Sequence, residues 1–387
     1  MLIYFKYAGF LLNQLTDTLS ALGSSRHFST HVLLPIGISF FTFEKISYIV
    51  DIWRGDVRAR RNPLDVLLFV FLFPRSIAGP IVRLREIEDQ LGVRPVRLDD
   101  LTEGATRFVH GLVKKVVVAD TVAPVADAAF ASGVHPTTTG AWLGALAYTL
   151  QIYFDFSGYS DMAIGLAQVF GFRLPENFNR PYSAVSITDF WRRWHMTLSR
   201  WFRDYVYIPL GGNRGPAGRV YFNLVLVFVL VGFWHGAQWT FLIWGAYHGT
   251  LLIIERVTGQ RPVGDGPVGA LVARRAITFL LVIIGWVFFR SPSIDGAAHY
   301  LWRMFTPHGF APGPGVEIAL TNQALIVGAL ALLVALFPRR LVVGRALAYS
   351  EGSLVNAGRA FVVGIGLPVA LILVVSGTFS PFLYFRF

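Results

Sequence analysis

Residues 231–249 read VGFWHGAQWTFLIWGAYHG and place two histidines, His235 and His248, in a run that is otherwise apolar. An ionisable side chain inside a membrane is costly, so it normally faces a protein interior or a water-filled cavity. The two histidines are therefore the first candidates for a functional site.

The apolar run around these histidines extends over residues 220–253. As one straight helix it would measure about 50 Å, which exceeds the hydrocarbon core of a bilayer at roughly 30 Å. We therefore expect a tilt, a break or a re-entrant turn. Gly232, Gly236 and Gly245 would allow a break, because irregular backbone is tolerated at membrane depth where it lines a cavity.

The composition of the whole chain is that of a polytopic membrane protein. Of its 387 residues, 54% are hydrophobic and only 15% are charged, and the mean hydropathy is +0.54. We expect an all-α protein with about eight crossings or partial crossings, forming one integral-membrane domain over residues 1–387. The apolar runs are residues 32–50, 64–82, 108–131, 140–170, 220–253, 271–289, 322–337 and 359–379.

The net charge of +11 comes from 34 Lys and Arg residues against 23 Asp and Glu residues. The basic residues lie mostly in short loops between apolar runs, which indicates membrane topology and no nucleic-acid partner. We place the arginine-rich residues 51–62 and the cluster of Arg339, Arg340 and Arg345 on the cytoplasmic side. The absence of cysteine excludes disulfides, thiolate nucleophiles and cysteine-ligated metal centres.

Residues 190–205, FWRRWHMTLSRWFRDY, have the pattern of an amphipathic helix lying at the membrane interface. One predicted stripe is polar and the opposite one is aromatic. The polar stripe consists of Arg192, His195, Ser199 and Arg203, and the aromatic stripe of Phe190, Trp194 and Trp201.

Each histidine has a functional interpretation and a structural one. His235 would suit a general base that takes a proton from a hydroxyl, or it is a core histidine bonded to a neighbouring helix. For His248 the structural interpretation is favoured. His195, close to Arg192, would suit an anionic donor or a carbonyl oxygen, or it is an interface residue. No HxxxH or HExxH spacing is present, so we predict no metal site.

Two carboxylates, Asp155 and Asp161, lie in the apolar segment 154–165 and need partners at membrane depth. We expect the arginines of residues 180–203 to pair with them and to form a polar interior. A proton relay is the functional alternative. The flanking residues 175–184 and 207–215 are turn-rich loops.

The chain resembles the membrane-bound O-acyltransferase family, in its branch similar to the bacterial alginate O-acetyltransferases. Two long ordered motifs carry the resemblance: RRWHMTLSRWFRDYVYIPLGGNR at 192–214 and GFWHGAQWTFLIWGAYHG at 232–249. Further matches are PIGISFFTFEKISYIVDIWRG at 35–55, FPRSIAGPIVR at 73–83, QIYFDFSGYSDMAIG at 151–165, NFNRPY at 177–182, GWVFFR at 285–290 and FLYFRF at 382–387.

The resemblance implies a multi-helix fold around a central funnel or tunnel, with interfacial and re-entrant helices, in a bacterial inner membrane. His235 matches the essential histidine of the family and His195 the histidine of its second motif. We expect substrate contacts from Trp234, Trp239, Arg192, Arg193, Asn179, Ser199 and Asp155, and a supporting role for His248, Gln238 and Tyr159.

The implied reaction transfers an acyl group, most simply acetyl, from a cytoplasmic thioester to a hydroxyl of an extracytoplasmic polysaccharide. The donor would be acetyl-CoA or another acyl thioester, on CoA or a carrier protein, with no tightly bound cofactor. A periplasmic acetyltransferase partner would relay the group if the transfer is indirect. D-alanyl transfer to teichoic acid and a proton-coupled transporter are the alternatives.

The chain departs from the family pattern in two ways. It begins at a position that lies several helices into other members, which predicts either that an N-terminal group of helices is absent or that the start codon is misassigned. Glu44, Arg75 and Arg386 stand where a neutral polar residue such as glutamine is expected.

Overall fold

The computed structural model describes residues 2–23, 26, 28, 35–95, 97–259, 267–336, 352–377 and 382. Within these ranges the chain is helical and contains no strand, which confirms the predicted all-α class. The predicted Arg339, Arg340, Arg345 cluster and Arg386 lie outside the described residues.

The helices of the first half are η1 (Ile3–Tyr7), α1 (Ala8–Ala21), α2 (Ile38–Arg54), α3 (Pro63–Val70), η2 (Phe73–Arg75), α4 (Leu84–Ile87), η3 (Glu88–Gln90), α5 (Leu98–Val113), η4 (Lys114–Ala119), α6 (Asp120–Ala129) and α7 (Thr138–Val169).

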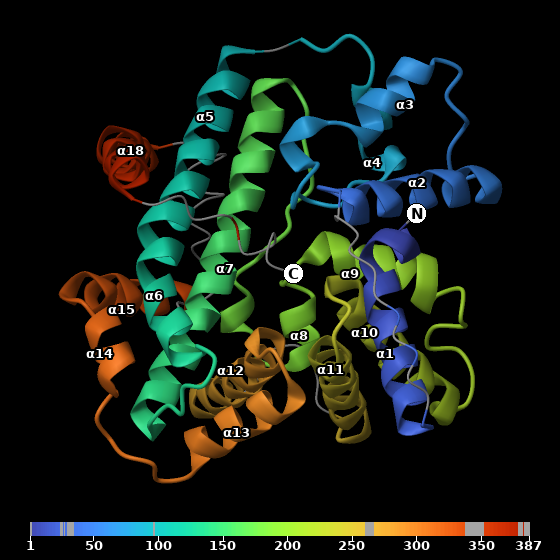
Figure 1. The fold of residues 1–387 in the computed structure, drawn as a ribbon. Coiled ribbons are helices and arrows are strands. Elements are labelled where there is room, and N and C mark those ends of the chain that lie inside the picture. Colours follow the sequence, from blue (N-terminus) through green and yellow to red (C-terminus); the bar gives the residue numbers. More distant parts are fainter. Residues whose placement is uncertain are drawn as a thin grey trace.

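Helices α5 and α7 run side by side through the molecule (Figure 1). Glycines allow their backbones to touch. A Cβ on Gly111 would lie 2.4 Å from the carbonyl oxygen of Gly158, and one on Gly104 would lie 2.6 Å from that of Gly165. Small residues at such crossings let membrane helices approach closely, so this pair forms a rigid support for the polar side chains of α7.

The second half of the chain contains η5 (Pro181–Ser183), α8 (Ile187–Trp191), α9 (Met196–Phe202), η6 (Arg203–Tyr207), α10 (Ala217–His235), α11 (Trp239–Val257), α12 (Val268–Arg290), α13 (Ile294–Phe305), α14 (Pro314–Ala319), α15 (Asn322–Leu336), α17 (Ser353–Phe361), η7 (Val362–Gly366) and α18 (Leu367–Ser376).

The long apolar run breaks where the sequence allowed it, between α10 and α11. Gly236 ends α10 in an extended conformation, and α11 starts at Trp239. The two helices then fold back on each other as a close hairpin. A Cβ on Gly232 would lie 2.1 Å from the carbonyl oxygen of Phe241, and one on Gly245 would lie 2.2 Å from that of Phe228. Glycine is therefore required at both positions for this packing.

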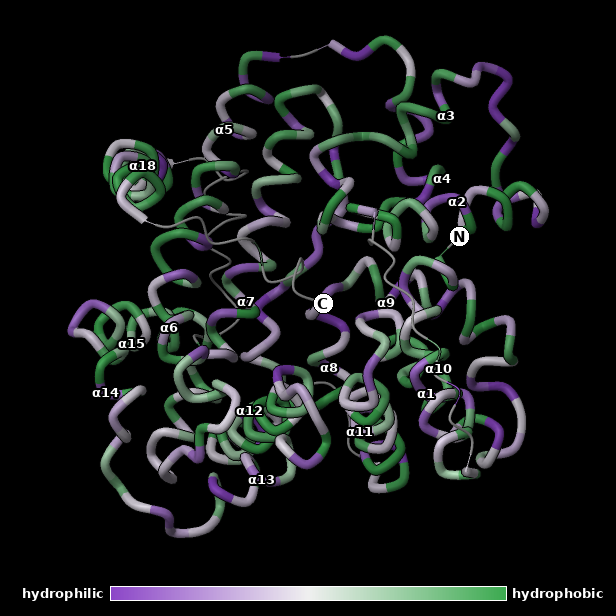
Figure 2. The backbone as a smooth tube through the Cα atoms, viewed as in Figure 1, coloured by the Kyte–Doolittle hydropathy of each residue, from purple (hydrophilic) through white to green (hydrophobic). Residues whose placement is uncertain are grey.

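Three helices of the described part are long and apolar enough to cross a membrane: α10, α12, and the continuous helix Ser353–Ser376 that joins α17, η7 and α18. Figure 2 shows hydrophobic residues predominating on α12 and α18, whereas hydrophilic residues gather in the loop between α2 and α3. The helix Ser353–Ser376 packs little against the rest of the described chain, with 6% of its apolar window buried. Its apolar surface suits contact with lipid.

The expectation of a helix long enough to span the membrane at residues 64–82 is wrong. Only α3 and the short 3₁₀ turn η2 form there. Pro74 lies in η2 and cannot donate a backbone hydrogen bond, and Pro80 follows six residues later. Between them a Cβ on Gly79 would lie 2.5 Å from the Cα of Arg75, so the chain turns tightly instead of continuing as a helix.

The expected single interfacial helix over residues 190–205 is also wrong. The segment divides into α8 and α9, and His195 between them has a left-handed backbone with φ 43°. Hydrogen bonds from distant residues hold this break: the Asn179 N–H donates to the Arg193 carbonyl and the Met196 N–H to the Asn177 carbonyl, both at 2.9 Å. The helical pattern is correct locally, and tertiary bonds override it at His195.

Candidate active site

His235 is the last residue of α10 and its ring is enclosed by aromatic side chains from three helices. Trp234 of α10, Trp244 of α11 and Phe289 of α12 contact it with ring centroids at 4.8, 5.4 and 5.1 Å. His235 is 8% exposed, and among the described residues no hydrogen bond to its ring is found. The helix break thus presents an imidazole at the end of a spanning helix, within an apolar wall.

His195 lies next to the same tryptophan, although it is forty positions earlier in the chain. Its ring centroid is 6.2 Å from that of Trp234 and 4.7 Å from that of Phe156 in α7. The side chain is fully buried, and burial lowers the pKa of His195 to about 3, so the ring is neutral at physiological pH. The structure therefore brings His195, Trp234 and His235 together.

His248 lies behind this group and is linked to it through two tryptophans. Its ring contacts Trp244 at 5.2 Å, and its Nδ1 accepts a hydrogen bond from the Trp191 indole at 3.3 Å. Gly285 of α12 provides the space for it, because a Cβ there would lie 2.8 Å from the His248 Nε2 atom. His248 is fully buried and positioned to hold the two indoles in place.

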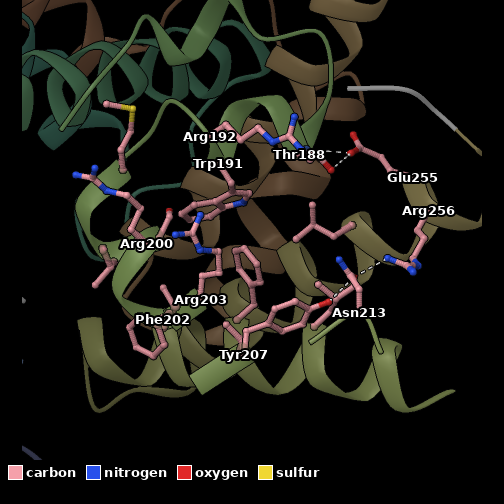
Figure 3. Close-up of a pocket in the computed structure, with 18 residues that line it drawn as sticks. Thr188, Trp191, Arg192, Arg200, Phe202, Arg203, Tyr207, Asn213, Glu255 and Arg256 are labelled. Atoms are coloured by element: carbon pink, nitrogen blue, oxygen red, sulfur yellow. Dashed lines mark hydrogen bonds between the residues drawn. The ribbon is translucent and has the colours of Figure 1, made fainter. Parts of the chain in front are cut away.

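A cavity of about 690 Å³ opens between α8, α9, η6, α10 and α11 (Figure 3). Trp191, which bonds His248, forms part of its wall, and Val231 of α10 lines it four residues before His235. Four arginines line the cavity against one carboxylate, so its electrostatic character is cationic. The arginines are Arg192, Arg200, Arg203 and Arg256, and the carboxylate belongs to Glu255.

Two hydrogen bonds shape the rim of this cavity, as Figure 3 shows. Arg256 donates to the Asn213 side chain at 2.9 Å, and Thr188 donates its hydroxyl to Glu255 at 2.8 Å. Glu255 also accepts backbone N–H groups of Ile187 and Thr188. Because these N–H groups belong to the first turn of α8, Glu255 fixes that helix to α11.

The predicted partners of the α7 carboxylates are wrong. Asp155 pairs with Lys115 at 2.7 Å, and Asp161 with Arg107 and Lys114, both at 2.6 Å. All three cations come from α5 and η4, because the glycine contacts place those elements directly against α7. The arginines of residues 180–203 point elsewhere: Arg193, for example, pairs with Asp189 at 2.7 Å.

Of the other predicted site residues, some line the cationic cavity and the rest lie away from it. Arg192 and Ser199 line the cationic cavity, whereas Arg193 is buried in its ion pair. The remaining predicted side chains lie away from that cavity. Asn179 and Gln238 are exposed. Trp239 is 51% exposed and donates a hydrogen bond to Gln14 at 3.1 Å, and Tyr159 donates one to the Pro74 carbonyl at 3.3 Å. No metal-binding group of three or more His, Cys, Asp or Glu side chains occurs in the described ranges.

Several residues of the site were missed from the sequence: Trp191, Trp244, Phe289, Asn177 and Glu255. Phe289, Asn177 and Trp244 lie inside motifs that carried the family resemblance, GWVFFR, NFNRPY and GFWHGAQWTFLIWGAYHG, and this was the available signal. Nothing local distinguished Trp191 and Glu255.

The sequence profile of the membrane-bound O-acyltransferase family matches residues 57–262, a range that contains His195, His235 and His248, Trp234 and the cationic cavity. The match covers more than half of the chain. The protein belongs to the membrane-bound O-acyltransferase family. The enclosed histidine at the break after α10 therefore lies in the segment that defines membership.

Individual relatives agree with this assignment. Over 302 residues the chain is 54% identical to the probable alginate O-acetylase AlgI of Azotobacter vinelandii, covering 78% of this chain and 59% of that protein. It is 40% identical to a peptidoglycan O-acetyltransferase of Helicobacter pylori, covering 80% and 63%, and 31% identical to a teichoic acid D-alanyltransferase of Bacillus subtilis, covering 58% and 60%. The chain thus spans about three fifths of the length of these curated relatives.

Proposed function

We propose that this protein is an O-acyltransferase of the bacterial inner membrane that moves an acetyl group from a thioester to a hydroxyl of an extracytoplasmic polysaccharide. The observation that carries the proposal is the enclosed imidazole of His235 at a helix break, beside Trp234 and the second histidine. Two relatives named as acetyl-transferring enzymes act as further support.

In the proposed reaction the hydroxyl oxygen attacks the thioester carbonyl carbon, the C–S bond breaks, and the thiol leaves. His235 takes the hydroxyl proton and returns it to the departing sulfur, so charge balances. General base catalysis by a positioned imidazole typically contributes about 10²–10⁴-fold to the rate. The aromatic walls exclude water, which would otherwise compete with the hydroxyl for the thioester.

The cationic cavity is the proposed entrance for the donor, acetyl-CoA or an acyl group on a carrier protein. The phosphate groups of such thioesters are anionic, and arginine is suited to bind them. The apolar wall of Leu198, Val227 and Val231 would accommodate the acyl arm on its way to His235.

Two other functions have less support. D-alanyl transfer to teichoic acid is carried out by relatives at 30 and 31% identity, compared with 54% for the alginate O-acetylases. A proton-coupled transporter is disfavoured by membership of an acyltransferase family. Purified protein in proteoliposomes separates these: labelled acetyl groups should appear covalently on an added polysaccharide or on a periplasmic acetyltransferase partner, whereas transport of polysaccharide without a thioester would reject the proposal.

The donor cavity yields one prediction. Arg192→Ala and Arg256→Ala should each raise the KM for acetyl-CoA about fivefold with little change in kcat, because a partly exposed charge contact contributes up to ~1 kcal/mol. The effect should diminish as salt is added, since salt screens exposed charges. Initial rates with labelled acetyl-CoA at several salt concentrations measure both effects.

Arg214→Ala is the matched control for these variants. Arg214 is exposed in the neighbouring turn and does not line the cavity. An equal rise in KM for Arg214→Ala would show that the net positive charge of the surface, and not this cavity, attracts the donor.

A further inference from the structure

Asn177 is a buried residue of the loop between α7 and η5, and the mechanism above gives it no part. It is 1% exposed, and its side chain contacts three others. The distances are 3.1 Å to the His195 Nδ1 atom, 2.9 Å to the Thr197 hydroxyl and 3.1 Å to the Ser160 hydroxyl. Asn177 and Ser160 also line a second cavity of about 390 Å³, on the α7 side of His195.

The surroundings determine which way the Asn177 amide points. The backbone N–H of Thr197 faces the amide at 3.3 Å, and an N–H can only donate, so the oxygen must lie on that side. The Thr197 hydroxyl accepts the N–H of Ile81 at 3.0 Å and donates to the same oxygen. The amide nitrogen, on the other side, donates to Ser160.

This orientation determines the tautomer of His195. The Asn177 oxygen has only lone pairs to offer, so the His195 Nδ1 atom facing it at 3.1 Å must carry the hydrogen. In a neutral imidazole the other nitrogen, Nε2, then bears a lone pair. Within the described part of the chain this Nε2 is buried and has no hydrogen-bond partner.

We propose that Asn177 is a positioning residue that locks His195 in the Nδ1–H tautomer, so that its Nε2 accepts a hydrogen bond from a neighbouring hydroxyl of the polysaccharide and thereby positions the hydroxyl that His235 deprotonates. The inference rests on the proposed acyl transfer for its catalytic consequence. Asn177 also holds the backbone, because its carbonyl accepts the Met196 N–H at 2.9 Å and so maintains the left-handed conformation of His195.

The ionisable groups on the elements around His195 are mostly paired. Asp155 and Asp161 of α7 are bonded to cations of α5 and η4, as described above, and Arg193 is bonded to Asp189. The titratable groups near Trp234 are the ring of His235, from α10, and the ammonium of Lys6, from η1. Lys6 donates to the Trp234 carbonyl. A new charge at position 177 should therefore act on His195 directly.

Two variants of Asn177 test the proposal. Asn177→Leu removes the acceptor, so His195 can adopt either tautomer. The variant should lower kcat about 10–100-fold at every pH with little change in KM, an effect of the size seen when a residue that orients a metal-binding histidine is lost. Asn177→Asp keeps an acceptor for Nδ1–H but adds a negative charge that favours the imidazolium. Its activity should fall at acid pH and recover at alkaline pH, with the acid limb of the rate profile displaced upward by about 1–3 pH units.

Asn62→Asp and Asn62→Leu are the matched controls, because Asn62 caps α3 at an exposed position and does not contact His195. Their pH profiles should equal that of the unchanged protein. Equal, pH-independent losses in both Asn177 variants would indicate a purely structural role and would overturn the proposal.

A direct readout does not depend on catalysis. With ¹⁵N-histidine labelling and the His195 signals assigned by a His195→Gln variant, nuclear magnetic resonance should find the proton on Nδ1 and an unprotonated Nε2. A proton on Nε2 would overturn the proposal. If the unchanged protein transferred no acetyl group, the proposed function would fail, while the tautomer would still be decided by this spectrum.

Discussion

His235→Ala is expected to lower acetyl transfer by about 10²–10⁴-fold, the contribution of a general base. The loss should appear in kcat, because in the proposed reaction His235 takes the proton that moves in the transition state, whereas the proposed binding site of the donor is the arginine-lined cavity. The measurement is transfer from labelled acetyl-CoA to a polysaccharide or partner acceptor with the purified full chain. His235→Gln should be similarly inactive, since an amide fills the space but does not accept a proton at this pH.

The matched control is His135→Ala, which removes an exposed histidine from the turn before α7. It should retain normal transfer. Thermal melting in detergent separates catalysis from folding: His235→Gln should melt close to the unchanged protein. Undiminished transfer by His235→Ala would show that His235 is not the general base. A melting temperature of His235→Gln lowered in proportion to the lost activity would indicate that His235 has a structural role.

Breaking the ion pair between Glu44 and Arg75 is expected to cost about 3–5 kcal/mol of stability. Both residues are 1% exposed, and the pair joins α2 to the turn that follows α3. Arg75 also donates to the Phe69 carbonyl. Glu44→Gln or Arg75→Gln alone leaves one buried charge without compensation, and each should lower the melting temperature strongly.

The double variant Glu44→Gln with Arg75→Gln should recover most of the loss, because it removes both charges and leaves two neutral polar side chains. This double replacement also restores the residue type that the family pattern predicts at these positions. Glu88→Gln is the control: its pair with Arg60, at 3.1 Å, is partly exposed and should contribute at most ~1 kcal/mol. A double variant no more stable than the singles would show that the two side chains do not stabilise each other.

Much of the fold could be read from the sequence because the relevant signals are local. Hydropathy and glycine placement predicted an all-helical membrane protein and a break within residues 220–253, and both are present. A run too long for a bilayer must be interrupted, and glycine permits the close hairpin that follows. His235 was likewise conspicuous, since an ionisable residue in such a run needs a reason to be there.

The errors concern contacts between distant segments. The pattern of residues 190–205 fits a helix by itself, and only the bonds from Asn177 and Asn179 produce the turn at His195. The partners of Asp155 and Asp161 lie 40 to 54 positions before them, on α5 and η4, where periodicity gives no information about proximity. Both predictions failed because tertiary hydrogen bonds and ion pairs outweigh local preference.

The sequence by itself determined the helical class and the interruption of the long apolar run, and it made His235 a candidate site residue, because hydrophobic length and the cost of a buried ionisable group are properties of single segments. Only the tertiary structure placed His195 beside Trp234, collected the arginines around one cavity and selected Asn177 as the acceptor for His195. These depend on which helices pack together, and that is decided by the fit of surfaces far apart in the chain.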